Sequence, residues 1–193
     1  MIFLSIAHLA AVAALFFWSW PAFISAVILY WIGGTGIGMG FHRLLTHRGY
    51  RCPKVVEYFL VICGSLSLEG GPITWVVTHR IHHAHTDRTG DPHTPRDGGW
   101  WAHIGWILDG RAQDYDQATL ERYAPDLTKD RFYVWLNRFY YVPLLLLGLI
   151  LFGFGGWSVM LWGIFLRLTL ALHATWLVNS ATHLWGRTRF AYR

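Results

Sequence analysis

Charged residues divide the chain into two long apolar blocks that flank a polar middle. Residues 1–42 contain no Lys, Arg, Asp or Glu, and residues 139–186 contain only Arg167. All 11 acidic residues and most of the 16 basic ones lie in residues 43–138. Because one helical crossing of a bilayer needs about 20 apolar residues, each block has room for two spans.

Turn signals fall inside each apolar block. Pro21 divides the first block, and the glycine-rich run at residues 153–156 divides the second. The charged middle and the basic tail then lie on one side of the membrane, which the positive-inside rule assigns to the cytoplasm. We therefore expect an all-α polytopic membrane protein with four transmembrane helices in two hairpins and a helical cytoplasmic cap. Both termini are expected on the cytoplasmic side.

This pattern predicts one domain over residues 1–193. Its parts are a first hairpin (1–42), a cytoplasmic region (43–138), a second hairpin (139–186) and the start of a cytoplasmic tail (187–193). The composition agrees, since 54% hydrophobic and only 14% charged residues are unusual in a soluble domain. The net charge of +5 favours anionic lipid surfaces and acidic partners. Basic residues are interleaved with acids, so we expect no nucleic acid partner.

The most concentrated chemistry lies in residues 78–87, which hold four of the 11 histidines. On a helix His79, His82 and His83 project from one face, so their imidazoles are expected to share a site. The run contains no cysteine. Clustered imidazoles without thiolates are typical of iron, copper or zinc sites.

Two further histidine motifs fall at the same predicted end of the helical bundle. His42 and His47 are five residues apart, about 140° around an ideal helix, so joint ligation needs a local unwinding or two different metals. Asn179 and His183 share a face of the last helix at spacing i, i+4. Together the motifs supply six histidines and one asparagine.

Six histidines are too many for one tetrahedral zinc ion, which takes four ligands. Two metals with mostly nitrogen ligands and a few open positions fit this set better. Asp91 and His93 lie in the turn after the cluster and are expected to be hydrogen-bonding partners that orient the ligands.

Together these motifs resemble the membrane fatty acyl desaturases. The matching residues are the first two histidine boxes, His42-xxxx-His47 and His79-xx-His82-His83, and the distal pair Asn179-xxx-His183. The likeness extends through residues 40–44, 78–83, 91–93 and 175–180 and covers nearly the whole chain. It indicates the delta-9 type found in bacteria and cyanobacteria.

The resemblance implies a di-iron enzyme that uses dioxygen and two electrons to place a cis double bond, at delta-9, in a saturated acyl chain. It implies two iron ions ligated directly by His42, His47, His79, His82, His83 and His183, and through water by Asn179. It also implies an acyl tunnel lined by Trp75, Thr175 and Trp176. A separate electron carrier is implied, either ferredoxin or a b-type cytochrome.

The chain departs from the family pattern in two places. The family has a third histidine box, HxxHH, after the last span, and none occurs before Arg193, so we expect this chain to be truncated before that box. Acyl-CoA desaturases resemble one another in an Arg-Asp pair just before the second box, where this chain has Val77 and Thr78. That favours an acyl lipid over an acyl thioester as substrate.

Two other functions fit parts of the pattern. A hydroxylase or ketolase would use the same histidine boxes, although the Asn179 and His183 pair favours a desaturase. A membrane metal transporter or sensor would also present cytoplasmic histidines. Such a protein should carry ionisable residues along its spans, and Arg167 is the only charged residue in either apolar block.

Overall fold

The computed structural model describes residues 2–110 and 114–186, and within them every regular element is helical. The predicted all-α class is confirmed. The longer helices are α1 (Ile2–Ala14), α2 (Trp20–Thr35), α3 (Lys54–Ser65), α4 (Pro72–His85), α6 (Gln117–Tyr123), α7 (Arg131–Arg138), α8 (Val142–Met160) and α9 (Arg167–Leu184). Shorter or wider helical segments are η1 (Gly36–Thr46), η2 (Pro95–Asp97), η3 (Trp101–Gly105), α5 (Trp106–Leu108) and η4 (Leu161–Leu166). The predicted tail at 187–193 lies outside the described residues.

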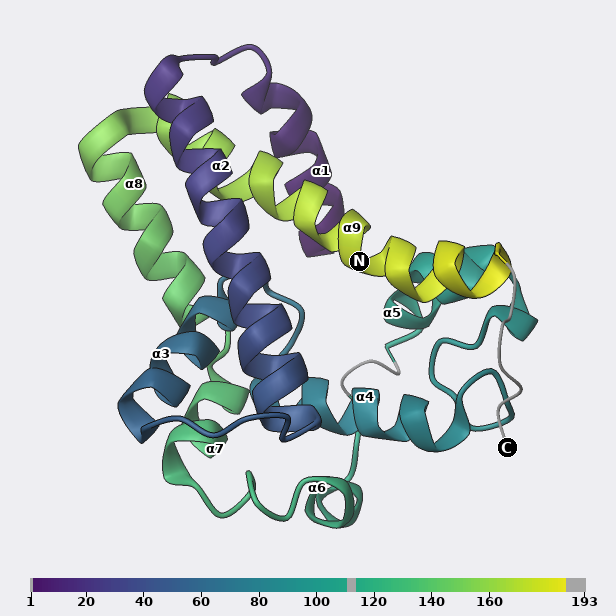
Figure 1. The fold of residues 1–193 in the computed structure, drawn as a ribbon. Coiled ribbons are helices and arrows are strands. Elements are labelled where there is room, and N and C mark those ends of the chain that lie inside the picture. The colour runs from purple at the N-terminus through teal and green to yellow at the C-terminus, as the bar shows by residue number, and fades with distance from the viewer. Residues whose placement is uncertain (1, 111–113, 187–193) are drawn as a thin grey trace.

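The first apolar block forms a helical hairpin of α1 and α2 (Figure 1). The turn lies at residues 15–19, slightly before the predicted position, and Pro21 instead occupies the first turn of α2. There proline costs no hydrogen bond, because the first backbone N–H groups of a helix have no partner within it. Ser19 caps α2 by accepting a hydrogen bond from the Ala22 N–H at 3.3 Å.

The second apolar block folds back at Gly156. The helical run Val142–Leu184 has 43 residues, which as one straight helix would be about 65 Å long. Gly156 adopts φ 62°, ψ −159°, a conformation that favours glycine, and interrupts the run. The segment η4 consequently packs against α8, and α9 continues away from the hairpin towards α5 (Figure 1).

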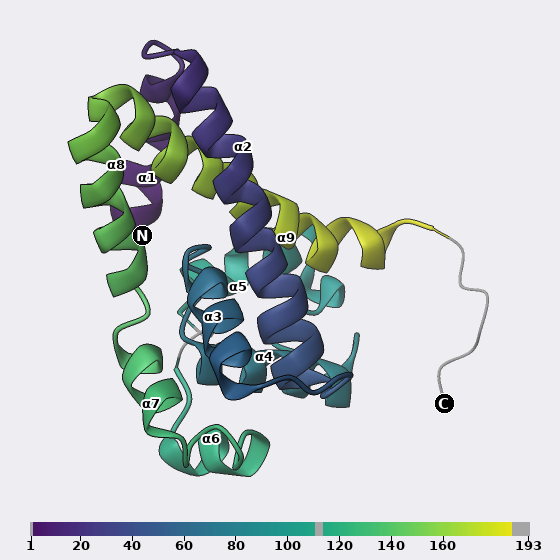
Figure 2. The same ribbon diagram turned by 60° about the vertical axis from the view of Figure 1, so that its left-hand side comes forward.

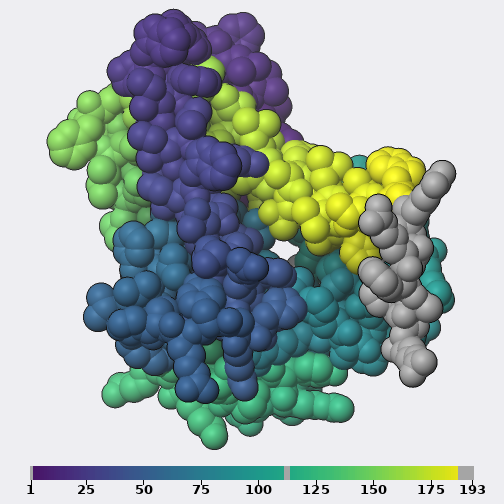
Figure 3. All heavy atoms as spheres, in the orientation of Figure 1, coloured from purple at the N-terminus to yellow at the C-terminus, as the bar shows by residue number. Residues whose placement is uncertain are grey.

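Two helices are long and apolar enough to cross a membrane, Trp20–Thr46 and Val142–Leu184, one in each predicted hairpin. Helix α1 is apolar but has only 13 residues, or about 20 Å, so the division into four spans stays a prediction. Large apolar side chains face outward on this half of the molecule, with Phe16 83% and Phe154 93% exposed. Figure 3 shows α1, α2 and α8 projecting as one lobe, whereas the yellow end of α9 lies against the remainder of the protein.

The polar middle forms a helical layer at the other end of the apolar hairpins, with α6 and α7 farthest from the turn between α1 and α2 (Figures 1 and 2). Helix α4 contacts η1, α6 and α7. Its Arg80 donates to the backbone oxygens of Leu45 at 2.6 Å and Tyr123 at 2.7 Å, and pairs with Asp126 at 3.2 Å. Helix α4 is thereby held against the end of η1.

Close backbone contact fixes η1 against α3. A Cβ atom added at Gly36 would lie 2.1 Å from the backbone nitrogen of Gly64, a distance that real side chains do not adopt. A Cβ atom at Gly34, on another side of the same helix, would meet nothing within 4 Å. The glycines of this stretch therefore differ in role, and Gly36 is the one that permits the close approach.

Arg167 is buried where α9 meets the end of α3. Its Nε donates to the backbone oxygen of Gly163 at 3.0 Å and its Nη1 donates to that of Leu66 at 2.8 Å. Backbone carbonyls thus replace the acidic partner that the apolar block lacks, which is one of the ways in which charged side chains are accommodated inside membranes.

Candidate metal centre

The π-helical form of η1 brings the first two histidines together. His47 N–H donates to the His42 carbonyl at 3.0 Å, which is the i to i+5 hydrogen bond of a π-helix. Residues five apart are aligned in such a helix, whereas in an α-helix they are about 140° apart. The two imidazoles consequently face each other, with their Nε2 atoms 3.1 Å apart. The π-helical segment is the kind of local unwinding that joint ligation of one metal by His42 and His47 was expected to need.

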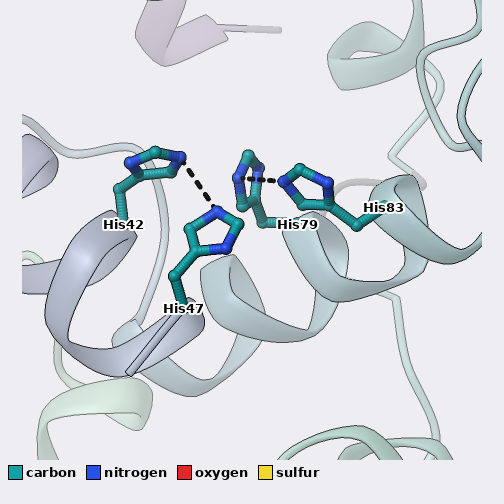
Figure 4. A group of neighbouring side chains, drawn as sticks. All are labelled: His42, His47, His79 and His83. Atoms are coloured by element: carbon teal, nitrogen blue, oxygen red, sulfur yellow. Dashed lines mark hydrogen bonds between the residues drawn. The ribbon is translucent and has the colours of Figure 1, made fainter. Parts of the chain in front are cut away.

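Helix α4 supplies a second facing pair, His79 and His83, whose Nε2 atoms are also 3.1 Å apart. The four imidazoles point towards one another across the gap between η1 and α4 (Figure 4). One ring nitrogen from each of His42, His47, His79 and His83 lies within 4.8 Å of the other three. We call these residues the four-histidine group.

The chemistry of the four-histidine group fits a transition metal. Imidazole nitrogens about 2.1 Å from one ion and at right angles to each other lie about 3.0 Å apart, close to the spacing of each facing pair. Burial, with smaller contributions from the neighbouring histidines, lowers the pKa of His79 to about 2. His79 is therefore neutral, which is the form that binds metals. The donor set includes neither Cys52 nor Cys63.

His82 joins a different group. It lies about 100° around α4 from His83, so its ring turns away from the four-histidine group. Its Nδ1 is 3.0 Å from both oxygens of Asp91, and the ring stacks on His93 with centroids 4.3 Å apart. We call His82, Asp91 and His93 the buried group, because all three are buried. The ring centroid of His82 still lies 6.0 Å from that of His79 and 5.6 Å from that of His83, and a site shared by all three stays a prediction.

Asp91 orients His82 as predicted. A metal-binding histidine commonly donates its other ring N–H to a carboxylate, and His82 Nδ1 does so, which leaves Nε2 free. Burial raises the pKa of Asp91, but the hydrogen bond with His82 and further contacts outweigh it, so the net pKa is lowered and the carboxylate stays charged. Burial lowers the pKa of His93 to about 4, and its buried Nδ1 has no hydrogen-bond partner.

His183 repeats this arrangement from α9. Its Nδ1 is 3.0 Å from Asp87 Oδ1, and its ring centroid lies 5.4 Å from that of His82. The backbone N–H of Asp87 donates to Asp91 Oδ2 at 2.9 Å, so the Asp91 carboxylate also fixes the backbone of Asp87. Asp87 was not among the predicted site residues, although an acid directly after a histidine cluster was the available signal.

An apolar pocket of about 260 Å³ adjoins both groups, because His79 and His93 both form part of its wall. This volume is near the lower end of the range for small-molecule sites. The four residues predicted to bind substrate or a metal-bound water also lie in the wall: Trp75, Thr175, Trp176 and Asn179. Apolar side chains from α1, α5 and α9 make up five of the nine remaining wall residues, namely Phe3, Leu4, Trp106, Ile107 and Leu172.

Glu69 contributes a partly buried carboxyl group to the pocket wall and was not identified from the sequence. It accepts hydrogen bonds from Trp75 Nε1 at 3.0 Å and Thr175 Oγ1 at 2.8 Å. Burial raises its pKa, and the two donors only partly oppose that effect. In the sequence Glu69 flanks a glycine-rich break, where a buried acid cannot be distinguished from an exposed one. The carboxyl links Trp75 on α4 to Thr175 on α9.

Known proteins similar to this chain include both acyl-lipid and acyl-CoA desaturases, the latter represented by the icosanoyl-CoA 5-desaturase of Limnanthes douglasii, which is 41% identical over 95% of this chain and 52% of that protein. The sn-1 stearoyl-lipid 9-desaturase of Anabaena variabilis is 49% identical over 169 residues, covering 87% of this chain and 61% of that protein. The sn-2 palmitoyl-lipid 9-desaturase of Nostoc sp. is 43% identical over 192 residues, covering 98% and 67%. The sn-1 stearoyl-lipid 9-desaturase of Synechocystis sp. is 46% identical over 182 residues, covering 93% and 56%.

The chain thus spans about three fifths of the length of these curated relatives. The sequence model of the family described as fatty acid desaturase matches residues 2–193. That match includes α1, both histidine groups, the pocket between them and α9. The chain therefore belongs to the fatty acid desaturase family.

Proposed function

We propose that the protein is a membrane-bound di-iron desaturase that places a cis double bond, at delta-9, in an acyl chain esterified in membrane lipid. The observation that carries this proposal is the apolar pocket whose wall contains one member of each histidine group, His79 and His93. A saturated chain in this pocket would lie beside both groups. The names of the relatives, which specify stearoyl-lipid and palmitoyl-lipid 9-desaturases, support the substrate class.

The proposed reaction combines a saturated chain, dioxygen, two electrons and two protons to give a cis alkene and two waters. Bound iron would supply the activation of dioxygen that removal of hydrogen from an unactivated methylene requires. The protein's part is to hold the imidazoles neutral and oriented, and to exclude water from the pocket. Glu69 holds Trp75 and Thr175 in the pocket wall.

The ligands divide naturally between two ions. We assign His42, His47, His79 and His83 to one iron. We assign His82 and His183 to the other, with Asn179 acting through a water molecule. Asp91 and Asp87 orient His82 and His183 through their Nδ1 atoms, and His93 packs on His82.

Two further observations concern the class of substrate and the side from which the electron donor would approach. Val77 and Thr78 occupy the positions where acyl-CoA desaturases resemble one another in an Arg-Asp pair, which favours an acyl lipid over an acyl thioester. The electrons would come from a separate carrier, either ferredoxin or a b-type cytochrome, which would approach from the polar side that carries His47 and His83.

We also propose that α1, α2, α8 and the helix formed by η4 and α9 are four membrane spans. The polar layer and both termini would then lie in the cytoplasm, as the positive-inside rule requires for a middle that holds most of the basic residues. The outward-facing apolar side chains of α1, α2 and α8 support this placement.

Expression in a host that lacks the activity, with mass spectrometry of its lipids, tests the function. From the coding sequence continued past Arg193 through a third histidine box, we expect monounsaturated chains with a double bond at carbon 9, and none when His79→Asn is introduced. Hydroxylated chains without a new double bond would instead favour the hydroxylase alternative. Purified protein that contains zinc, or one metal per chain, would favour a metal transporter or sensor.

A further inference from the structure

Three histidines outside both metal-binding groups form a continuous hydrogen-bonded chain. His8 on α1 contacts His173 on α9, with their Nε2 atoms 2.9 Å apart. The other nitrogen of His173, Nδ1, lies 3.1 Å from Nε2 of His103 on η3. We call His8, His173 and His103 the imidazole chain. It is distinct from a metal site, because His173 uses its two nitrogens in opposite directions and the three rings do not converge on one point.

Both ends of the imidazole chain terminate beside the apolar pocket. At one end His8 Nδ1 donates to the backbone oxygen of Leu4 at 2.7 Å, and Leu4 lines the pocket. At the other end His103 Nδ1 lies 3.1 Å from the Ser180 hydroxyl, and Ser180 follows the pocket residue Asn179. The imidazole chain therefore lies behind the pocket wall, where it contacts the wall residues Leu4 and Trp176. A route that carried protons from solvent to a metal would need one end at the surface.

Trp176 lies at the centre of this network. Its side chain is 2% exposed and forms part of the pocket wall. The rings of His173 and His103 meet it edge-on, with centroids 4.9 Å and 5.8 Å away. The hydroxyl of Ser180 donates to the Trp176 carbonyl at 2.9 Å. The indole thus packs against two imidazoles, the backbone carbonyl of Trp176 is held by Ser180, and the side chain forms part of the pocket wall.

The hydrogen positions in this network depend on one another. The Leu4 carbonyl can only accept, so His8 must donate with Nδ1 and turn Nε2 towards His173. The Trp176 carbonyl can likewise only accept, so the Ser180 hydroxyl donates to it and His103 donates to the hydroxyl oxygen with Nδ1. Loss of one member therefore disturbs the remaining contacts, as expected of a cooperative hydrogen-bond network.

We propose that His8, His173 and His103 are positioning residues that hold Trp176 against the acyl chain and thereby set which methylenes face the metal groups. The imidazole chain connects α1, η3 and α9. Helices α1 and α9 supply residues of the pocket wall, and η3 leads directly into α5, which supplies more of them. This inference rests on the proposed desaturase function, because it assigns the position of the double bond to the pocket wall. The substrate is an acyl chain, and the residues act on it through Trp176.

The position of Trp176 can be tested without turnover. The full chain is labelled with 5-fluorotryptophan, placed in lipid nanodiscs and examined by ¹⁹F NMR, and the Trp176 resonance is assigned with Trp176→Phe. We expect His103→Phe and Ser180→Ala to shift or broaden this resonance. His85→Asn is the matched control, because His85 lies outside both metal-binding groups and the imidazole chain, and it should leave the resonance unchanged. An unshifted resonance in both test variants overturns the inference.

The effect of these substitutions on the position of the double bond is measured by mass spectrometry of the lipids. We expect His103→Phe and Ser180→Ala to raise the share of double bonds away from carbon 9 several-fold, with an unchanged metal content per chain. A shifted Trp176 resonance with unchanged bond position overturns the assignment of specificity. If wild-type and control chains make no unsaturated product, the proposed desaturase function fails, and the ¹⁹F result still decides whether the imidazole chain positions Trp176.

Discussion

Among single residues, we expect the aspartates that accept hydrogen bonds from the imidazoles to have the most direct effect on metal binding. His82 and His183 each use Nδ1 on an aspartate, so Nε2 of each ring is the nitrogen available to a metal. A histidine without such a partner can rotate and change its tautomer, which weakens its binding. Asp91 therefore controls the buried group without ligating the metal itself.

Asp91→Asn is expected to lower metal affinity at the buried group by about 10- to 100-fold, the usual effect of removing an outer partner of a metal ligand. Equilibrium dialysis against buffered Fe²⁺ and metal analysis would measure the change. His85→Asn changes a histidine of the same helix that belongs to neither group and should retain wild-type affinity. Equal metal loss in both variants would refute the role of Asp91.

Glu69 is predicted to make stability fall as pH rises. Burial raises its pKa in the folded state, so the folded protein binds this proton more tightly than the unfolded chain. Stability is then fully present below the unfolded pKa of about 4.3 and is lost as pH rises through the folded pKa. Glu69→Gln removes the ionisation and should flatten the dependence of the melting temperature on pH. An unchanged slope would contradict the prediction.

Glu69→Leu is the complementary change. It leaves the Trp75 and Thr175 donors without their acceptor in a buried wall, at a cost of about 1–3 kcal/mol. We expect a lower melting temperature than that of Glu69→Gln at every pH, measured by thermal unfolding in the same detergent.

The helices themselves determine which histidines can meet. In η1 the extra residue per turn aligns His42 with His47, and in α4 the ordinary α-helical turn aligns His79 with His83. The two facing pairs then oppose each other because η1 packs on α3 and contacts α4. A π-helical segment at a functional site is a common use of this strained geometry.

Gly36→Ala is expected to destabilise the protein by about 1–3 kcal/mol, because the new Cβ would displace the backbone of Gly64. Gly34→Ala is the matched control, since its Cβ enters open space and alanine favours the helix by about 1 kcal/mol. Melting temperatures in detergent should fall for the first variant and stay level or rise for the second. The reverse order would show that η1 and α3 do not pack this closely.

At the scale of the whole molecule, segments far apart in the chain meet at one pocket. Its wall takes Leu4 from the first helix, His79 from the fourth and Asn179 from the last. The imidazole chain and the Glu69 bridge connect the same helices by polar contacts. We therefore expect metal binding and the shape of the pocket to depend together on the packing of α9 against the other elements.

The four-span topology predicts opposite exposure of two labelled sites. In intact inverted vesicles, a cysteine at Thr182 should react with a membrane-impermeant maleimide on the cytoplasmic face. A cysteine at Phe16, in the turn between α1 and α2, should react only after the vesicles are opened. Labelling of both sites from one face would contradict the arrangement.

Sequence patterns alone determined the chemistry and the broad architecture. The absence of charge from residues 1–42 and the single Arg167 in residues 139–186 specify apolar helices, because a bilayer penalises any other composition. Histidine spacing identified the candidate ligands, since spacing along a helix fixes which side chains share a face. The resemblance to the desaturases, and not a pattern of spacing, pointed to Trp75, Thr175 and Trp176 as tunnel residues, and all three lie in the wall of one pocket.

Tertiary structure decided what depends on packing between distant segments. The separation of His82 from His79 and His83 arises because Asp91 and His183 approach one side of α4 while His42 and His47 approach another. The alignment of His42 with His47 needed the π-helix, which local sequence did not specify. Glu69 and the imidazole chain became visible only when α1, η3 and α9 were brought together, because burial and hydrogen bonding are properties of the folded chain.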